Sequence, residues 1–208
     1  ELKRLFDGAR TYRKRGPLVN EPICIRYILM ITYMLGLRIS ETLSIKIKDI
    51  DLEKMYVHIH CSKFYKSRLV TFNEQVSKLM QEILQWRSTQ MYPMVEDAYV
   101  FINLKGKPVN FVSLHQIFTT IRKNAGLYFP DRGRHQPRIH DLRHTFAVTV
   151  LTNWYKSGKN VQDLLPKLST YLGHLNVSFT SVYLTKTPTL LQEANKLFYA
   201  YKNTNNEE

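Results

Sequence analysis

The stretch from Pro22 to Leu35 is the feature that most constrains the fold of this chain. Its apolar residues occupy nearly every side of the helix that it would form, which is typical of a helix buried in a core. Gly36 ends this helix, and Ser40 is expected to cap a short second helix with Glu41 in its first turn. The length of 208 residues suits one domain with a sizeable core.

Further segments repeat apolar residues at helical spacing and are predicted to pack as amphipathic helices. Val161–Tyr171 is expected to be helical despite Pro166. The predicted helices are Glu74–Met91, Asn110–Ala125, His140–Trp154, Val161–Tyr171 and Leu190–Tyr201.

Short β-prone runs lie between these helices. Met55–His60 and Arg68–Phe72 are predicted to pair as a hairpin through a turn at Cys61–Ser67, and Tyr99–Ile102 is expected to be a further short strand. Leu127–Pro137 is expected to be an irregular basic loop. The predicted fold class is therefore mostly α with a small antiparallel β-sheet, which is an α+β fold.

The charge balance indicates a polyanionic partner. Lysine and arginine outnumber aspartate and glutamate by 30 to 17, which gives a formal net charge of +13. Nucleic acid is the simplest partner for such an excess, although solubility or a membrane surface would also account for it. Residues 1–17 are strongly basic, and they fit either a solvated helix and loop or a lead-in that follows DNA.

The cysteines and the apolar runs argue against secretion and against a membrane span. Cys24 and Cys61 are the only cysteines and form no C-x-x-C, so neither a disulfide framework nor a zinc ribbon is predicted. The longest apolar run, Ile23–Leu37, is interrupted by Arg26 and is too short to span a bilayer. We expect a cytoplasmic protein and, because the chain begins with Glu1 in an apparent helix, a fragment of a longer one.

Four side chains in the last third of the chain are suited to holding and attacking a phosphate. His140 and Arg143 are three residues apart and share a helix face, while Tyr183 follows His174 by nine residues. Arginine offers a fixed fork of donors to phosphate oxygens, and histidine moves a proton near neutral pH. A deprotonated tyrosine is a covalent nucleophile.

Three motifs in order resemble those of the tyrosine recombinases, the family of phage and transposon integrases. The first is G-L-R-I-S-E at Gly36–Glu41, the second is H-D-L-R at His140–Arg143, and the third is L-G-H at 172–174 followed by Tyr183. Each motif alone is weak, but three in this order over the expected length are specific. The resemblance runs from about Ile23 to Tyr183 and implies the catalytic-domain fold of that family.

The resemblance implies a role for each matching residue. Tyr183 would attack a DNA phosphate and form a 3′-phosphotyrosyl link. The phosphate oxygens would be bonded by Arg38, Arg143 and His174, and His140 would help to deprotonate the tyrosine or bond an oxygen. No cofactor is expected, because the tyrosyl ester conserves the energy of the broken bond.

In this family a lysine on the β-hairpin protonates the leaving 5′ oxygen. The family pattern is approximately G-K-G-x-K-x-R, and this chain has C-S-K-F-Y-K-S-R, which aligns Lys63 with the catalytic lysine. Ser62 and Phe64 stand where the pattern has glycines, so Lys66 stays an alternative. Lys66 and Arg68 are otherwise expected to contact DNA.

Other residues near the motifs are expected to support the site or to contact DNA. Glu41 and Asp141 could orient the arginines, and His144 is expected to be a structural or supporting residue. The basic loop before the second motif offers three further candidates for DNA contacts, which are Arg132, Arg134 and Arg138.

A zinc site is the rival interpretation of the histidines. His140 and His144 are four residues apart, and His174 could be a third ligand. Asp141 stands where an H-E-x-x-H motif has glutamate, and a metal would leave the arginines and the tyrosine unexplained. No metal site is therefore predicted.

The tyrosine and the first arginine also have structural alternatives. Tyr183 is one of 13 tyrosines and could be a packing residue, as Tyr155 and Tyr171 could be. The nine-residue spacing alone singles out Tyr183. Arg38 could be a surface residue that forms a salt bridge with Glu41.

The predicted function is that of a site-specific DNA recombinase that integrates or excises a mobile element. Residues 1–187 would be its catalytic domain, residues 188–208 a helix and tail that dock on a neighbouring subunit or fold back, and an N-terminal core-binding domain would lie outside this chain. The resemblance implies a DNA-associated bacterial protein that is a monomer alone and a homotetramer on paired sites of double-stranded DNA, without a membrane. The alternatives are an inactive DNA-binding relative and a type IB topoisomerase-like relaxing enzyme.

Overall fold

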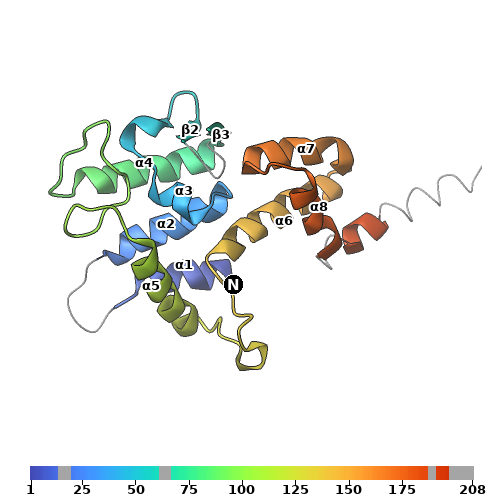
Figure 1. Ribbon diagram of the computed structural model, residues 1–208. Helices are drawn as coiled ribbons and strands as arrows, with labels where there is room; N and C mark the ends of the chain where they lie inside the picture. Colours follow the sequence, from blue (N-terminus) through green and yellow to red (C-terminus); the bar gives the residue numbers. More distant parts are fainter. Residues whose placement is uncertain (14–19, 61–66, 187–190, 197–208) are drawn as a thin grey trace, which may run out of the picture. The chain divides into compact units, whose positions relative to one another are not determined.

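The computed structural model describes residues 1–13, 20–60, 67–186 and 191–196 (Figure 1). The chain divides into two compact units, Glu1–Arg143 and His144–Glu208. The elements in chain order are α1 (Leu2–Arg10), α2 (Pro22–Met34), α3 (Ile39–Leu43), β1 (Ile50–Asp51), β2 (Tyr56–Ile59), β3 (Arg68–Thr71), α4 (Glu74–Ser88), α5 (Phe111–Asn124), α6 (His140–Lys156), α7 (Val161–Leu172) and α8 (Ser178–Lys186). The predicted fold class, mostly α with a small antiparallel sheet, is confirmed.

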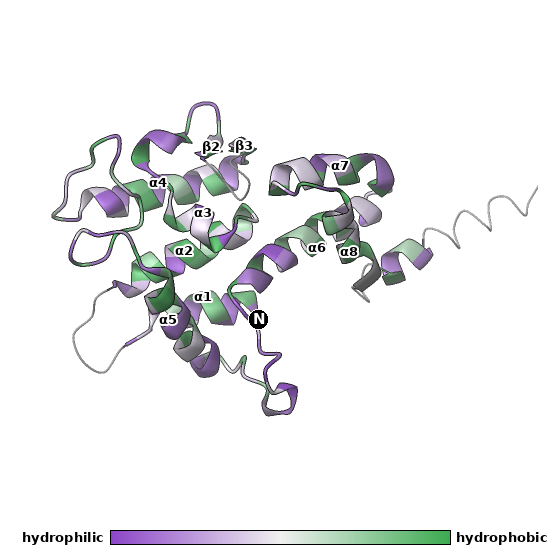
Figure 2. Cartoon of the chain, viewed as in Figure 1, coloured by the Kyte–Doolittle hydropathy of each residue, from purple (hydrophilic) through white to green (hydrophobic). Residues whose placement is uncertain are grey.

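The central helix of the first unit is α2, as predicted. Cys24, Ile25, Ile28, Leu29 and Ile31 are fully buried, and Figure 2 shows hydrophobic residues along most of this helix. α1, α3 and α4 pack against α2, and α1 also packs against α5. The apolar residues on different sides of α2 are thus covered by different neighbours, which is why the pattern shows no single apolar face.

The sheet is antiparallel with the strand order β1-β2-β3. Val57 of β2 lies opposite Ile50 of β1 and opposite Val70 of β3. Val57, Ile59 and Val70 are buried, so one face of the hairpin lies on the core. The predicted hairpin is confirmed, although most of its turn, residues 61–66, lies outside the described residues. β1 was not predicted, because two residues show no periodicity.

The prediction of a strand at Tyr99–Ile102 is wrong. This segment makes isolated bridges and belongs to no named strand among the residues that the structure describes. The guanidinium of Arg87, which is 2% exposed, donates to the carbonyls of Tyr92, Pro93 and Tyr99 at 2.8 to 3.1 Å. The backbone N–H of Val100 donates to the carbonyl of Ile45, and that of Val109 donates to the carbonyl of Phe101. The segment therefore bonds a different neighbour at successive residues and forms no continuous ladder.

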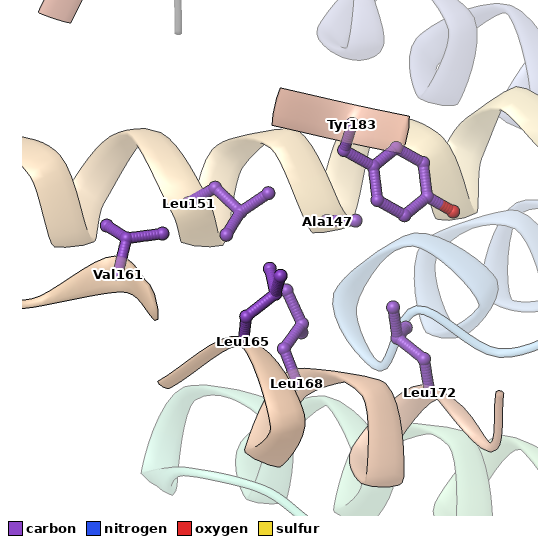
Figure 3. Close-up of a cluster of buried hydrophobic side chains, with 7 residues drawn as sticks. All are labelled: Ala147, Leu151, Val161, Leu165, Leu168, Leu172 and Tyr183. Carbon is purple, nitrogen blue, oxygen red and sulfur yellow. The ribbon is translucent and has the colours of Figure 1, made fainter. Parts of the chain in front are cut away.

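The second unit has a core formed by α6, α7 and α8. α6 begins with the last residues of the first unit, and α7 continues through Pro166 as predicted. Residues 191–196 are helical and belong to the predicted helix Leu190–Tyr201, whose remainder lies outside the described residues. α8 was not predicted. Figure 3 shows the core side chains, which are Ala147, Leu151, Val161, Leu165, Leu168, Leu172 and Tyr183.

Candidate active site

The turn between α2 and α3 positions Arg38. Gly36 has φ +59°, a left-handed conformation that is strained for other residues, and Leu37 is fully buried. The backbone N–H of Arg38 donates to Oε2 of Glu41 at 2.9 Å, so Arg38 rather than Ser40 is the residue that precedes α3. The prediction that Ser40 caps this helix is wrong, because the carboxylate of Glu41 reaches back three residues to Arg38, so the helix starts two residues earlier than predicted.

Glu41 joins Arg38 and Arg68 through both of its carboxylate oxygens. Oε1 accepts from Nη1 of Arg38 and from Nη1 of Arg68, each at 2.8 Å, and Oε2 accepts from Nη2 of Arg68 at 2.9 Å. Glu41 is 6% exposed, and the side chain of Arg68 is 10% exposed. A bidentate charged pair therefore ties the first residue of β3 to α3.

The surroundings keep Glu41 ionised. Burial by itself raises the pKa of Glu41, but the hydrogen bond and positive charge of Arg68, followed by the backbone N–H and charge of Arg38, outweigh burial and lower the pKa to about 2. The carboxylate is therefore charged at neutral pH. A permanently charged acceptor holds both guanidinium groups in fixed positions.

Arg143 reaches the same carboxylate from the first turn of α6. Its side chain is 2% exposed, and its Nη1 lies 3.9 Å from Oε2 of Glu41. The same nitrogen donates to the carbonyl of Gly36 at 2.9 Å. The turn that presents Arg38 therefore also holds Arg143. The structure thus brings together Arg38, Glu41, Arg68 and Arg143 from three separate parts of the sequence.

The residues at the start of α6 are more exposed than Arg143. His140 is exposed, and the side chain of Arg138 is 67% exposed. Asp141 accepts from the backbone N–H of Arg138 at 2.8 Å and pairs with its guanidinium at 3.3 Å. Asp141 thus pairs with Arg138, while its predicted supporting role and the proton-transfer role of His140 stay predictions.

The loop before α6 exposes Arg132 and Arg134, the other predicted DNA contacts. Arg132 stacks over the ring of Phe129 at 4.3 Å. The loop is held by Gln136, whose amide bonds both backbone groups of Phe129, at 3.0 and 2.6 Å, and the carbonyl of Gly133 at 3.2 Å. Gln136 was not singled out from the sequence, because a lone glutamine in a polar loop carries no pattern.

The predicted general acid, Lys63, and its alternative, Lys66, lie outside the described residues. The two stems of their hairpin are both anchored by buried carboxylates. Nε2 of His60 lies 2.7 Å from Oδ1 of Asp49, which is 3% exposed, and Arg68 pairs with Glu41 on the other stem. The positions of His60 and Arg68, the residues on either side of the hairpin turn, are therefore fixed by these two contacts.

Tyr183 lies on α8 near two histidine rings of the second unit. Its ring centroid is 5.3 Å from that of His144 in an edge-on arrangement and 6.4 Å from that of His174 at 26° between the planes. Tyr183 is 7% exposed and belongs to the apolar core, with its hydroxyl on the side away from Leu151 and Val161 (Figure 3). The ring of Tyr183 thus packs in the core, as the structural alternative expected. The nucleophilic role of its hydroxyl stays a prediction.

His174 is placed by the end of α7. Gly173 has φ +68° and ψ +44°, and the backbone N–H groups of Gly173 and His174 donate to the carbonyls of Thr170 and Ser169, both at 2.9 Å. These paired bonds stop the helix and direct the next residue away from it. Nδ1 of His174 then lies 2.8 Å from Oγ1 of Thr180, a residue that the sequence did not single out.

The described residues contain neither a cluster suited to a metal ion nor a membrane-spanning helix. In that part of the chain, no cluster of three or more histidine, cysteine, aspartate or glutamate side chains is arranged to hold a metal ion. Nor is any described helix both long enough and apolar enough to cross a bilayer.

Arginines around a buried carboxylate, with a tyrosine near two histidines, are the features expected of the class that the sequence motifs resemble. Comparison with known protein families agrees, because the chain matches the phage integrase family over residues 1–189. The chain belongs to this family.

Relatives and solved structures extend the comparison. The Sinorhizobium fredii protein y4rB is 35% identical over 162 residues, which cover 76% of this chain and 50% of that protein. Tyrosine recombinase XerC of Lactobacillus delbrueckii subsp. bulgaricus is 33% identical over 167 residues, covering 79% and 52%. The chain thus spans about half the length of the curated relatives it matches.

A solved structure of XerH site-specific recombinase, bound to palindromic difH substrate in a post-cleavage complex, is similar with a TM-score of 0.67. The identity is 24%, and the match covers 95% of this chain and 51% of that one. This likeness supports the fold assignment.

Proposed function

We propose that the chain is the catalytic half of a site-specific recombinase that cleaves and rejoins double-stranded DNA. The observation that carries this proposal is the cluster of Arg38, Arg68 and Arg143 around the single carboxylate of Glu41. Guanidinium groups that are fixed in advance suit a phosphodiester, whose transition state gathers charge on its non-bridging oxygens. Membership of the phage integrase family supports the same reaction.

In the proposed reaction the hydroxyl oxygen of Tyr183 attacks phosphorus, and the bond between phosphorus and the 5′ oxygen breaks. The phosphate remains on the tyrosine as a 3′-phosphotyrosyl ester, and Lys63 supplies a proton to the departing 5′ oxygen. A 5′ hydroxyl of another strand then attacks the ester and releases Tyr183. No nucleotide cofactor is consumed, because the ester stores the energy for rejoining.

The remaining residues act on the phosphate. Arg38 and Arg143 bond its non-bridging oxygens, a contribution worth several kcal/mol in comparable sites, on the order of 3. His174 donates to a phosphate oxygen, and His140 accepts the proton of Tyr183 or bonds an oxygen. Glu41 holds the arginines, and the exposed basic residues, which include Arg132, Arg134 and Arg138, contact the DNA backbone.

The proposal includes an assembly. Residues 1–187 form the catalytic domain, residues 188–208 dock on a neighbouring subunit, and a core-binding domain of the longer protein completes the grip on DNA. Four copies act on two sites to integrate or excise a mobile element. The similar XerH structure, a post-cleavage complex with difH substrate, supports DNA as the partner.

Covalent trapping tests the proposal without a known target. The full-length protein is incubated with random duplexes, nicked so that cleavage releases a short strand, and the covalent products are mapped by peptide and DNA sequencing. An adduct on Tyr183 is expected. An adduct on another tyrosine would refute the assignment of the nucleophile. Salt-sensitive binding without any adduct would favour an inactive DNA-binding protein, and relaxation of plasmids without a need for paired sites would favour a topoisomerase-like enzyme.

A further inference from the structure

The hydroxyl of Thr180 contacts a ring that the proposed reaction uses. Oγ1 of Thr180 lies 2.8 Å from Nδ1 of His174, and Thr180 is fully buried. Thr180 and Tyr183 are three residues apart on α8, so they lie on the same side of that helix. One turn of α8 therefore carries both the tyrosine and a polar contact to the histidine near it.

Other threonines of the second unit use their hydroxyls differently. Thr149, Thr152 and Thr170 each bond the carbonyl four residues earlier in their own helix, at 2.8 to 3.1 Å, which is a common arrangement for a helical threonine. Among the described residues, the hydrogen-bond partner of the Thr180 hydroxyl is the ring of His174. A fully buried hydroxyl requires such a partner, because solvent does not reach it and an unbonded donor is costly.

This requirement determines which ring nitrogen carries the hydrogen. The Thr180 hydroxyl satisfies its own proton by donating to a bare Nδ1, and a neutral imidazole with a bare Nδ1 carries its hydrogen on Nε2. The other tautomer would use the hydroxyl of Thr180 as an acceptor and leave its buried proton unbonded. The contact therefore favours the tautomer of His174 in which Nε2 is the donor.

We propose that Thr180 is a positioning residue that keeps the hydrogen of His174 on Nε2 and holds the ring near Tyr183. With this tautomer, Nε2 donates to a phosphate oxygen while the ring is neutral, a use that rests on the recombinase reaction proposed above. Thr180 itself acts through His174. Side chains that orient a functional histidine through its second nitrogen typically change activity about 10- to 100-fold in metal sites, which sets the scale expected here.

The first test needs no DNA. Thr180→Val removes the hydroxyl and keeps the side-chain shape, while Thr180→Ser keeps the hydroxyl as the matched control. Long-range proton–nitrogen spectra of the ¹⁵N-labelled histidines of the 208-residue chain report which nitrogen holds the hydrogen in the neutral ring. We expect an Nε2 hydrogen on His174 in the unmodified chain and in the serine variant, and a larger Nδ1 population in the valine variant.

An Nδ1 hydrogen in the unmodified chain, or the same tautomer in all three proteins, would overturn the proposal. Thr180→Ala provides the same comparison should the valine variant fail to fold. Because the spectra do not depend on cleavage, a full-length protein that forms no adduct would count against the recombinase reaction alone, and the role of Thr180 would still be decided.

The second test measures adduct formation by the full-length protein. Thr180→Val is expected to slow it about 10-fold, whereas Thr180→Ser retains most of the rate. In a His174→Ala background, Thr180→Val should cause no further loss, because the hydroxyl acts only through that ring. An equal loss in both backgrounds would show that Thr180 acts by packing α8, and the proposal would fail.

Discussion

The two units hold their candidate functional side chains in opposite surroundings. In the first unit, Arg38, Arg68 and Arg143 surround the ionised carboxylate of Glu41, and the contacts are charged hydrogen bonds and ion pairs. In the second unit, Tyr183 is packed in an apolar cluster beside two histidine rings. Ion pairs hold the side chains of the first unit in place, whereas apolar packing holds Tyr183.

This difference separates two tasks of the proposed reaction. Cations stabilise a transition state best when they are fixed beforehand, and one buried carboxylate fixes several guanidinium groups at once. A nucleophilic ring needs a defined position, which apolar packing supplies. Charge changes in the cluster around Glu41 should therefore alter stability, whereas removal of the Tyr183 hydroxyl in the second unit should alter chemistry and leave stability nearly unchanged.

The largest effect is expected from Tyr183→Phe. Covalent adduct formation should fall below detection, because phenylalanine lacks the attacking oxygen, while the ring still fills the core. DNA binding and the unfolding midpoint should change little. Tyr171→Phe is the matched control, because Tyr171 packs against the same cluster and was a rival tyrosine. Trapped product from Tyr183→Phe but not from Tyr171→Phe would reverse the assignment.

Glu41→Gln should produce the largest loss of stability. The substitution keeps the size of the side chain but leaves Arg38, Arg68 and Arg143 without their shared negative charge, which typically costs about 3–5 kcal/mol for a buried pair. Urea unfolding of the 208-residue chain measures it. Asp97→Asn serves as control, because Asp97 pairs with Lys46 and Lys48 on the surface, and no shift of its midpoint is expected. Equal midpoints for both variants would contradict this account of the cluster.

Acid should weaken the protein through the same carboxylate. The pKa of Glu41 is lowered from 4.5 to about 2 in the folded chain, so its contribution is fully present above about pH 4.5 and is lost as the pH falls toward 2. A shift of that size corresponds to about 3 kcal/mol. Unfolding of the unmodified chain and of Glu41→Gln across this pH range isolates the contribution. If the free energies of unfolding of the two proteins changed with pH in parallel, Glu41 would not contribute to the loss of stability in acid.

Several elements were predictable because their signal is local. The apolar density of Pro22–Leu35 predicted α2, and the two β-prone runs predicted the hairpin. α8 was missed although it carries Tyr183, because its nine residues, Ser178–Lys186, mix small polar and apolar side chains without a clear apolar face. Ser40 was mistaken for a cap because its residue type favours that position, whereas the reach of Glu41 back to Arg38 decides it.

The residue types of the candidate site were predictable from motifs, but their pairings were not. The bond from Arg143 to the carbonyl of Gly36 joins positions 107 residues apart. The pairs Arg68–Glu41 and Thr180–His174 depend on which rotamers the packed structure allows. None of these contacts leaves a periodic trace in the sequence, which is why Arg68 was expected at DNA and Thr180 was not considered.

The smallest expected effect separates the two roles available to Arg68. If its guanidinium serves Glu41, Arg68→Gln should destabilise the chain by about 1.5–3 kcal/mol and leave the salt dependence of DNA binding unchanged. Arg138→Gln is the converse control, because Arg138 is exposed, and it should lower the slope of log K against log salt by about 0.9 without a change in stability. Binding is measured with the full-length protein at several salt concentrations. A reduced salt slope of DNA binding for Arg68→Gln, with unchanged stability, would assign Arg68 to a phosphate contact. The cluster around Glu41 would then be a DNA-binding surface and not a structural network.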